Sequence, residues 1–213
     1  MAHITTVIWD WNGTLLDDVA LCARLIDTLL TRHGYAPVGS LERYRQVFRF
    51  PVRAYYEDVG FDFSRHPFDE LAAEYMELYT PQSEACGLVS GALDTVRRLR
   101  EKGLRQVILS ASRTDILRAQ VAARGLDGYM DALVGIGDIY AKSKVDAGLR
   151  WLRESGTDAS RALLVGDSTH DFETAQALCA QCVLFAGGHQ PEKTLAATGA
   201  PVIGRLADVE KYL

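Results

Sequence analysis

Three carboxylates and one hydroxyl stand at or just after apolar runs of the sequence. Asp10 follows TTVIW, Ser110 follows QVIL, and Asp167 and Asp171 lie in GDSTHD, directly after ALLV. Crowded carboxylates raise one another's pKa unless a cation joins them, and a set of oxygen ligands suits Mg²⁺. Because Mg²⁺ is usually held by one or two carboxylates together with a substrate phosphate, the pattern predicts a metal site that receives a phosphoryl group.

Residues next to these side chains supply the groups that an anion needs. Gly13, in the NGT that follows Asp10 by one residue, allows the backbone to approach closely, and amides that point one way form an anion-binding nest. Two of the five lysines, Lys142 and Lys144, lie in AKSKVDAG, just before a predicted helix. A cation at this place would offset the charge of a nucleophile and of a transferred phosphoryl group.

The apolar pattern predicts a scaffold that brings these side chains together. Short, β-branched runs recur along the chain, each followed by a turn and a helical pattern: TTVIW, QVILS, RALLV, CVLF and APVI. Such runs are typical of buried strands in a parallel sheet covered by helices on both faces. The sequence therefore predicts an α/β fold with a doubly wound parallel sheet, in which ligands bind beyond the carboxyl ends of the strands.

One long segment interrupts the alternation of strands and helices. From about Asp17 to Glu84 every pattern is helical, with Gly, Pro and Ser between VALCARLIDTLLTRHG, SLERYRQVF, PVRAYYEDVG and HPFDELAAEYMELY. We therefore predict a small helical cap domain at 17–84, inserted after the first strand of a core domain that comprises 1–16 and 85–213.

Composition argues against several classes of partner. Lys and Arg number 23 against 28 Asp and Glu, and no basic block exists to neutralise nucleic acid or an anionic membrane. The start MAHITTVIWD lacks the pattern of a secretion signal, and no apolar run approaches the about 20 residues that span a bilayer. We expect a cytoplasmic protein with reduced cysteines, in which Cys179 and Cys182 are small core residues.

Four motifs occur in a fixed order over nearly the whole chain: IWDWNGTLLDD, VILSAS, the KSK region and LLVGDSTHD. In this the sequence resembles the haloacid dehalogenase-like hydrolase superfamily, and more narrowly its phosphoglycolate phosphatase-like branch with a helical cap. The resemblance implies an enzyme in which Asp10 attacks phosphorus and forms an aspartyl-phosphate, which water then hydrolyses. The partner would be a small phosphorylated metabolite.

The resemblance also implies roles for the other motif residues. Ser110 would bind the phosphoryl oxygens, and Lys144, with Lys142 as the alternative, would be the cation of the third motif. Asp167 and Asp171 would hold Mg²⁺ together with Asp10 and the backbone carbonyl of Asn12. The remaining expected substrate contacts are Gly13, Thr14, Ala111 and Ser112 of the core, and Arg49, which lies between two phenylalanines of the cap.

Asn12 departs from the pattern of the phosphatases that the chain resembles. They typically carry Asp there, which protonates the leaving oxygen and later deprotonates water. An amide does not titrate near neutral pH, and general acid–base catalysis is typically worth about 10²- to 10⁴-fold. Three interpretations are open: a phosphatase limited to activated phosphates, a slow phosphatase in which His170 or His189 compensates, or a phosphate- or partner-binding protein with little turnover.

Other features of the sequence have simpler interpretations. Phosphonatase-like enzymes need a cap lysine, and no lysine occurs from Leu15 to Gly87. We expect Asp17 and Asp18 to be helix caps or first-turn charges, and Trp9 and Trp11 to turn away from Asp10 into the core. The sequence predicts neither the particular substrate nor the oligomeric state, since phosphoglycolate rests on analogy alone.

Overall fold

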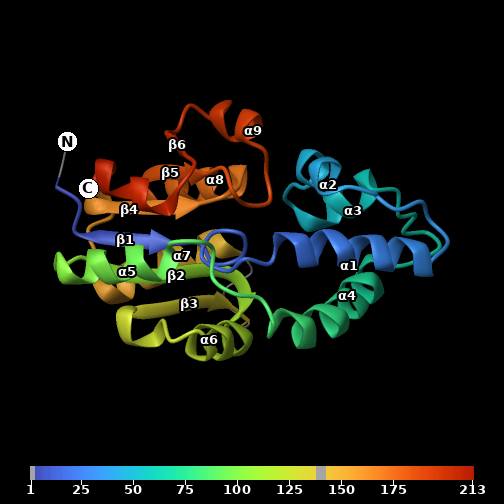
Figure 1. The fold of residues 1–213 in the computed structure, drawn as a ribbon, viewed down its shortest axis with the longest axis horizontal. Helices are drawn as coiled ribbons and strands as arrows, with labels where there is room; N and C mark the ends of the chain where they lie inside the picture. Colours follow the sequence, from blue (N-terminus) through green and yellow to red (C-terminus); the bar gives the residue numbers. More distant parts are fainter. Residues whose placement is uncertain (1–2, 138–142) are drawn as a thin grey trace.

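The computed structural model describes residues 3–137 and 143–213. They form a layered α/β part and, at one end of its sheet, a second part made of helices (Figure 1). Within the described residues, the sheet has six parallel strands in the order β3-β2-β1-β4-β5-β6. Their bounds are β1 Thr6–Trp9, β2 Arg105–Arg113, β3 Ala132–Ile136, β4 Ala162–Gly166, β5 Gln181–Phe185 and β6 Val202–Ile203.

The strand order reverses at β1, which pairs with β2 on one side and with β4 on the other. In a doubly wound sheet, the crevice beyond the carboxyl ends of the strands at such a reversal is the usual ligand site. The predicted α/β fold with a doubly wound parallel sheet is therefore confirmed.

Helices cover both faces of the sheet, and β1 alternates between the two cores. Val7 and Trp9 pack into one core with residues of α5 and α6, whereas Ile8 packs into the other with residues of α7 and α8. The helices of this part are α5 Ala92–Glu101, α6 Thr114–Ala123, α7 Lys144–Ser155, α8 Thr169–Leu178 and α9 Glu192–Ala196, with short 3₁₀ turns η1 Asp127–Tyr129, η2 Ala159–Arg161 and η3 Leu206–Tyr212.

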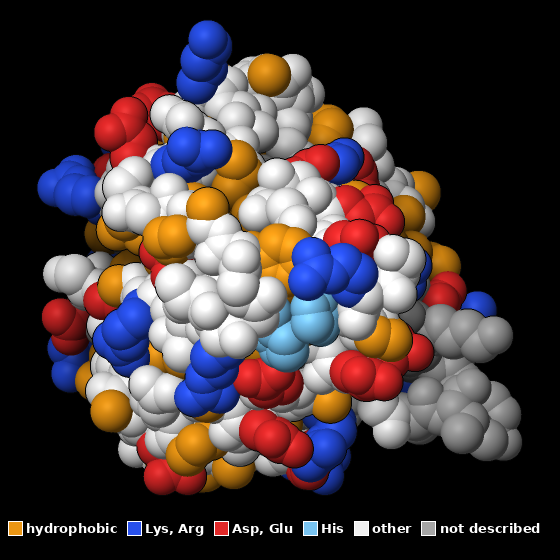
Figure 2. Space-filling view, turned by 90° about the vertical axis from the view of Figure 1, so that its right-hand side faces the viewer, with side chains coloured by type: hydrophobic (Ala, Val, Ile, Leu, Met, Phe, Trp, Pro, Cys, Tyr) orange, Lys and Arg blue, Asp and Glu red, His pale blue; other side chains and the backbone are white. Residues whose placement is uncertain are grey.

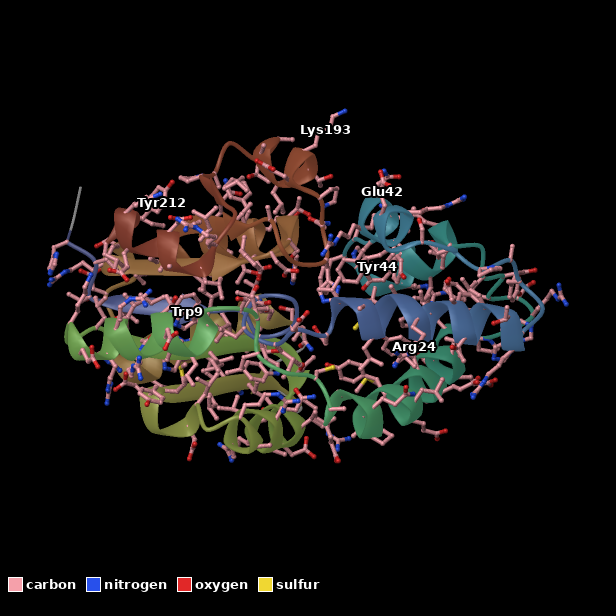
Figure 3. The ribbon with its side chains drawn as sticks, viewed as in Figure 1. Trp9, Arg24, Glu42, Tyr44, Lys193 and Tyr212 are labelled. Carbon is pink, nitrogen blue, oxygen red and sulfur yellow. The ribbon has the colours of Figure 1, made fainter. Side chains whose placement is uncertain are left out.

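Trp9 and Trp11 are fully buried in this core, as predicted. The Trp9 indole donates a hydrogen bond of 3.0 Å to Gln106 Oε1, and the Trp11 indole one of 2.7 Å to Gln120 Oε1. Each indole N–H therefore has a partner, which a buried tryptophan needs. Figure 3 shows Trp9 inside the sheet layer, away from the helical part.

Strand β3 was missed by the sequence analysis because its pattern is weak. ALVGI contains a glycine and lies at an edge of the sheet, where most of its side chains are only half-buried. A side chain at Gly135 would place Cβ 2.7 Å from the Ser112 carbonyl oxygen. Glycine therefore allows β3 to approach β2 closely, where the register shifts between Leu109 and Arg113.

The helical part follows β1 and has an apolar core of its own. It consists of α1 Val19–Arg32, α2 Leu41–Val47, α3 Val52–Asp58 and α4 Phe68–Ser83, close to the four predicted helical segments. Its buried cluster includes Leu25, Leu29, Tyr44 and Leu71, and all of its fully buried members lie between residues 19 and 79. These facts agree with a helical cap, and its bounds of 17–84 stay a prediction.

The outer end of the helical part carries acidic and basic side chains side by side, with hydrophobic side chains in small separate groups (Figure 2). Such a mixture is typical of a solvated surface. No helix within the described residues is both long and apolar enough to cross a membrane.

The four cysteines are free, and their burial differs from the prediction in one case. Cys22 is buried, Cys86 and Cys182 are half-buried, and Cys179 is exposed. Cys179 stands at the end of α8 with a left-handed φ of 58°. The prediction of a core position was wrong for Cys179 because the helix ends there and turns the residue outward.

Candidate active site

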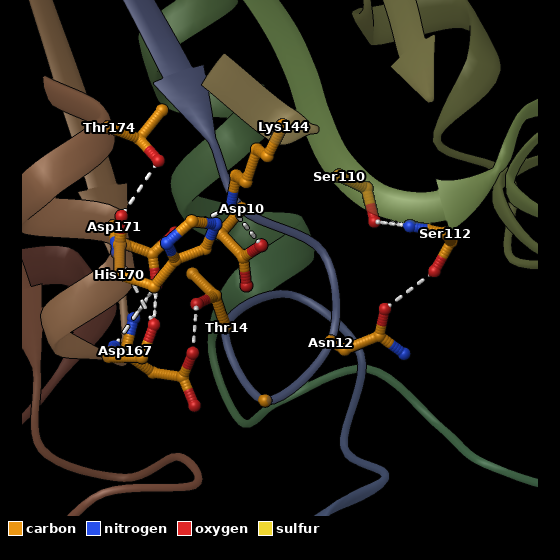
Figure 4. A network of polar contacts seen from close by, with 12 residues as sticks. Asp10, Asn12, Thr14, Ser110, Ser112, Lys144, Asp167, His170, Asp171 and Thr174 are labelled. Carbon is orange, nitrogen blue, oxygen red and sulfur yellow. Dashed lines mark hydrogen bonds and ion pairs between the residues drawn. The ribbon is translucent and has the colours of Figure 1, made fainter. Parts of the chain in front are cut away.

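Lys144 joins two of the predicted acidic residues at the carboxyl end of the sheet (Figure 4). Its Nζ lies 2.5 Å from Asp10 Oδ1 and 2.5 Å from Asp171 Oδ1, and all three side chains are buried. Lys144 is the first residue of α7, whose N-cap Ser143 accepts a hydrogen bond from the Asp146 amide. Between the two predicted lysines, Lys144 thus reaches the carboxylates, and Lys142 lies outside the described residues.

Asp10, Asp167 and Asp171 converge on one buried place. Each offers a carboxylate oxygen, and these oxygens all lie within 4.8 Å of one another. Three glycines make this crowding possible. A side chain at Gly13 or Gly188 would overlap Asp167, and one at Gly166 would overlap Asp171. Gly13 also has a left-handed φ of 74°, which favours glycine.

Burial and mutual repulsion determine how these carboxyl groups titrate. Burial raises the pKa of Asp167 to about 8, and the charges of Asp10 and Asp171 add to the effect. Burial raises the pKa of Asp10 to about 6, although Lys144 opposes the change. The pKa of Asp171 is lowered despite its burial, because Lys144 pairs with it. Three buried oxygen donors that repel one another fit a hard divalent cation such as Mg²⁺.

Asp171 and Asp167 are oriented by their own loop and by the loop after β5. Asp171 Oδ2 accepts hydrogen bonds from the Ser168 amide at 3.0 Å and the Ser168 hydroxyl at 2.6 Å. The Asp171 amide in turn donates to Ser168 Oγ at 3.4 Å, which completes a capping box at the start of α8. Asp167 Oδ2 accepts one from the His189 amide at 2.5 Å, and Asp167 Oδ1 one from the Thr14 hydroxyl at 3.5 Å.

Asn12 faces the helical part and uses both ends of its amide. Its Nδ2 donates to Asp18 Oδ2 and to the Tyr79 hydroxyl, each at 2.7 Å. Its Oδ1 accepts a hydrogen bond of 2.8 Å from the Ser112 hydroxyl, and the Ser112 amide donates one of 3.0 Å to Ser110 Oγ. Asn12 therefore links the loop after β1 to the end of β2 and to α4.

Asp18 belongs to this site, contrary to the prediction of a helix cap. It stands at the N-cap position of α1, yet its side chain makes no capping hydrogen bond and is fully buried. It accepts hydrogen bonds from the Gly13 amide at 2.9 Å and the Tyr79 hydroxyl at 2.7 Å. Burial opposes ionisation, but hydrogen bonds from His189, Asn12 and Tyr79 lower the pKa of Asp18.

A signal for Asp18 was present in the sequence. Asp18 lies four residues before Cys22, on the face of α1 that also buries Leu25 and Leu29. An acid that continues the apolar stripe of a helix must point inward, toward polar partners.

Both candidate histidines line the crevice between the two parts. His189 is buried, its Nδ1 lies 2.8 Å from the Tyr44 hydroxyl, and its Nε2 lies 3.7 Å from Asp18 Oδ1. Its pKa is raised despite burial, because Asp18 and Asp167 are close. The His170 ring stacks on the Phe50 ring at 4.5 Å. Each histidine thus contacts an aromatic residue of the helical part.

The helical part contacts the loop after β5 through α2 and the residues that follow it. Arg45 donates to the carbonyl oxygens of Gly188 at 2.9 Å and Gly187 at 3.0 Å. Gln190 Nε2 donates to the Phe48 carbonyl oxygen at 3.0 Å. Figure 3 shows Tyr44 on the inner side of α2. These contacts close the crevice over a cavity of about 70 Å³ that Asp10, Lys144 and Asp167 help to line.

Arg49 is the predicted site residue that the structure does not bring to this place. Its Nε lies 2.5 Å from Asp58 Oδ2, and its side chain is about half exposed, at 51%. The reason is local, since α3 presents Asp58 as a partner on the outer surface while the flanking Phe48 and Phe50 face the crevice. The other described candidates converge: Asp10, Asn12, Gly13, Thr14, Ser110, Ala111, Ser112, Lys144, Asp167 and Asp171.

Comparison with known proteins agrees with this geometry. The model of the family described as haloacid dehalogenase-like hydrolase matches residues 7–185. A phosphoglycolate phosphatase of Rhodobacter capsulatus is 29% identical over 193 residues, which cover 86% of this chain and 85% of that protein. One of Pseudomonas savastanoi pv. phaseolicola is 26% identical over 204 residues, covering 89% and 72%.

Solved structures share the fold over nearly the whole length. A haloacid dehalogenase-like family hydrolase from Streptococcus pneumoniae gives a TM-score of 0.86 at 17% identity and covers 100% of this chain and 99% of that one. CbbY from Rhodobacter sphaeroides in complex with phosphate gives 0.73 at 19% identity, covering 97% and 96%. The expected phosphoglycolate phosphatase-like branch, in which these relatives are named as phosphohydrolases, is confirmed. The chain belongs to the haloacid dehalogenase-like hydrolase family.

Proposed function

We propose that this protein is a Mg²⁺-dependent phosphatase of small phosphorylated metabolites, that it acts through an aspartyl-phosphate on Asp10, and that it is restricted to esters with good leaving groups. The observation that carries the proposal is the buried cluster in which Lys144 bridges Asp10 and Asp171 beside Asp167. A nucleophile, a cation and spare carboxylates in one crevice are the parts that phosphoryl transfer needs.

The donor set fits the metal that the family resemblance implies. Asp10, Asp167, Asp171 and the backbone carbonyl of Asn12 would hold Mg²⁺. When bound, the ion supplies positive charge beside the phosphoryl oxygens.

The protein's own residues would carry out the transfer. The Asp10 carboxylate attacks phosphorus, while Lys144 fixes its orientation and offsets negative charge. The Ser110 hydroxyl and the Ala111 amide would bind the phosphoryl oxygens. Water then attacks the aspartyl-phosphate, which releases inorganic phosphate and restores the Asp10 carboxylate.

Asn12 sets the restriction on substrates. Its amide does not act as an acid near neutral pH, and its Nδ2 donates hydrogen bonds to Asp18 and Tyr79. Asn12 therefore gives no proton to the leaving oxygen. Without that proton, the loss of a simple alkoxide is slow, whereas a weakly basic leaving group departs more readily.

A time course with Mg²⁺ tests the proposal. We expect inorganic phosphate to be released from acetyl phosphate and aryl phosphates. Asp10→Asn should abolish this release and should no longer bind beryllium fluoride. Turnover that persists in Asp10→Asn would contradict the aspartyl-phosphate. A protein that binds beryllium fluoride with Mg²⁺ but releases no phosphate from any ester would instead be a phosphate-binding protein, the second candidate, which the loss of an acid at position 12 favours.

A further inference from the structure

We propose that the substrates are aryl phosphate monoesters, in which a neutral apolar ring system is bonded to the ester oxygen. The inference rests on the proposed function and names its substrate class. Two separate features of the structure lead to it: a large aromatic cavity beside the site and the engaged amide of Asn12.

The cavity is large and continuous with the site. Its volume is about 910 Å³, and its lining comes from the helical part as well as from the ends of β2 and β3. Asn12, Ala111, Phe48, Phe50 and His189 line both this cavity and the small one around Asp10. A phosphate ester bound with its phosphorus beside Asp10 would therefore have its leaving group directed into a space of the size that binds drug-like molecules.

The lining of the large cavity is mainly aromatic and aliphatic. Seven Phe and Tyr side chains line it, and Ile26, Val52, Met76 and Ile116 add aliphatic surface. Aromatic side chains bind flat apolar rings through large contact areas and edge-to-face or stacked geometry. A glycolate-sized leaving group would leave most of this surface without a partner.

Two charged side chains of the cavity lining, Arg113 and Asp18, are already paired, and a third, Glu77, is itself an acid. Arg113 is the one Lys or Arg among its described lining residues, and Asp115 accepts two hydrogen bonds from it, at 2.6 and 2.7 Å. The buried Asp18 is satisfied by Gly13, Asn12 and Tyr79. Within the described lining, a carboxylate or second phosphate on the leaving group would thus meet no unpaired cation, and its desolvation would oppose binding.

The chemistry of the leaving group points the same way. A phenol has a pKa of about 10, as in tyrosine, so an aryl oxide departs without a proton far more readily than an alkoxide. In the first step the Asp10 oxygen–phosphorus bond forms and the phosphorus–aryl oxygen bond breaks. The aryl oxide leaves with the electron pair and takes a proton from solvent. In the second step, water replaces Asp10 on phosphorus and its protons pass to phosphate and solvent.

Four substrates separate ring size from leaving-group basicity. They are 1-naphthyl phosphate, 1-naphthylmethyl phosphate, acetyl phosphate and phosphoglycolate, assayed with the full chain and Mg²⁺. We expect 1-naphthyl phosphate to have the highest kcat/KM. Both alkyl esters should be at least about 100-fold lower, because their leaving oxygens need a proton and the protein has no acid at position 12 to supply it. Acetyl phosphate should be hydrolysed with a higher KM. Equal kcat/KM for phosphoglycolate and 1-naphthyl phosphate would overturn the aryl assignment alone, whereas no turnover of any of the four would overturn the proposed function.

Binding of phosphonates gives a readout that does not depend on turnover. We expect benzylphosphonate to compete with inorganic phosphate at least about tenfold better than phosphonoacetate does. Met76→Trp, which narrows the cavity, should reduce this preference several-fold, and Glu70→Trp, on the exposed side of α4, should leave it unchanged. Thermal melts report whether both variants fold. Equal affinity for the two phosphonates in the unmodified protein would overturn the proposal.

Discussion

At the scale of single residues, Asn12 and Asp18 act as a pair. The Asn12 amide nitrogen lies 2.7 Å from an oxygen of the fully buried Asp18. An aspartate at position 12 would place a carboxylate oxygen where that nitrogen is, against a second carboxylate. Two carboxyl groups at such a distance cannot both ionise without a large cost in free energy. The missing acid is therefore not restored simply by changing residue 12.

We predict that Asn12→Asp alone gives little gain and lowers the free energy of unfolding by about 1–3 kcal/mol, because a buried hydrogen bond becomes a repulsion. The double variant Asn12→Asp with Asp18→Asn exchanges the two groups. It should restore stability and raise kcat/KM for alkyl phosphates by about 10²- to 10⁴-fold. Kinetics on phosphoglycolate and denaturant unfolding measure both effects. A full gain in the single variant, with unchanged stability, would contradict the pairing.

Lys144 is the second residue whose effect can be predicted. Its removal leaves Asp10 and Asp171 buried without their cation, and breaking a buried pair typically costs about 3–5 kcal/mol. We predict that Lys144→Met loses activity at least about 10³-fold and is destabilised in the absence of Mg²⁺. Lys193→Met, at an exposed position of α9, is the matched control. Comparable activity and melting temperatures in the two variants would show that Lys144 has no such role.

At the scale of elements, the sequence predicted those strands and helices whose pattern is set by residues close together in the chain. Buried strands such as β4 read as continuous apolar runs, and α1 showed its helical period, so the sheet and the helical insertion could be foreseen. The edge strand β3 could not be predicted, because its apolar pattern is weak and its glycine is explained only by the close approach to β2 in the folded structure.

The site divides in the same way. Asp10, Asp167 and Lys144 were predicted because they follow apolar runs or lie in a motif. The helical period could have shown that Asp18 points inward, but two of its partners, Tyr79 and His189, are 61 and more residues away along the chain and could not be predicted. Arg49 was assigned from its neighbours, and the packing of α3 gave it Asp58 instead.

The contact of α2 with the loop after β5 makes a prediction at this scale. Arg45 binds two carbonyl oxygens of that loop, whereas Arg43 lies exposed on the same helix. We expect Arg45→Ala to raise KM several-fold with a smaller change in kcat, because the crevice closes less readily over the substrate. Arg43→Ala should match the unmodified protein. An unchanged KM in Arg45→Ala would show that this contact does not control closure.

At the scale of the whole molecule, the buried acids connect stability to pH and to the metal. Asp167 has its pKa raised from 3.8 to about 8, so between these values the folded chain holds a proton that the unfolded chain has lost. The free energy of unfolding therefore falls as pH rises through this range. Asp10, raised to about 6, acts in the same direction, and the raised pKa of His189 adds a loss of stability at higher pH.

A divalent cation opposes this loss of stability at higher pH, because it binds the ionised carboxylates of the folded state and has no such site in the unfolded state. We predict that Mg²⁺ raises the melting temperature little at pH 5 and by at least about 5 °C at pH 8, since each pKa unit is worth about 1.4 kcal/mol. Asp167→Asn removes the titrating group. It should melt higher than the unmodified protein at pH 8 without Mg²⁺ and gain little from the ion. If the rise in melting temperature with Mg²⁺ were equal at both pH values, or persisted in Asp167→Asn, stabilisation by the metal would not depend on ionisation of these carboxyl groups.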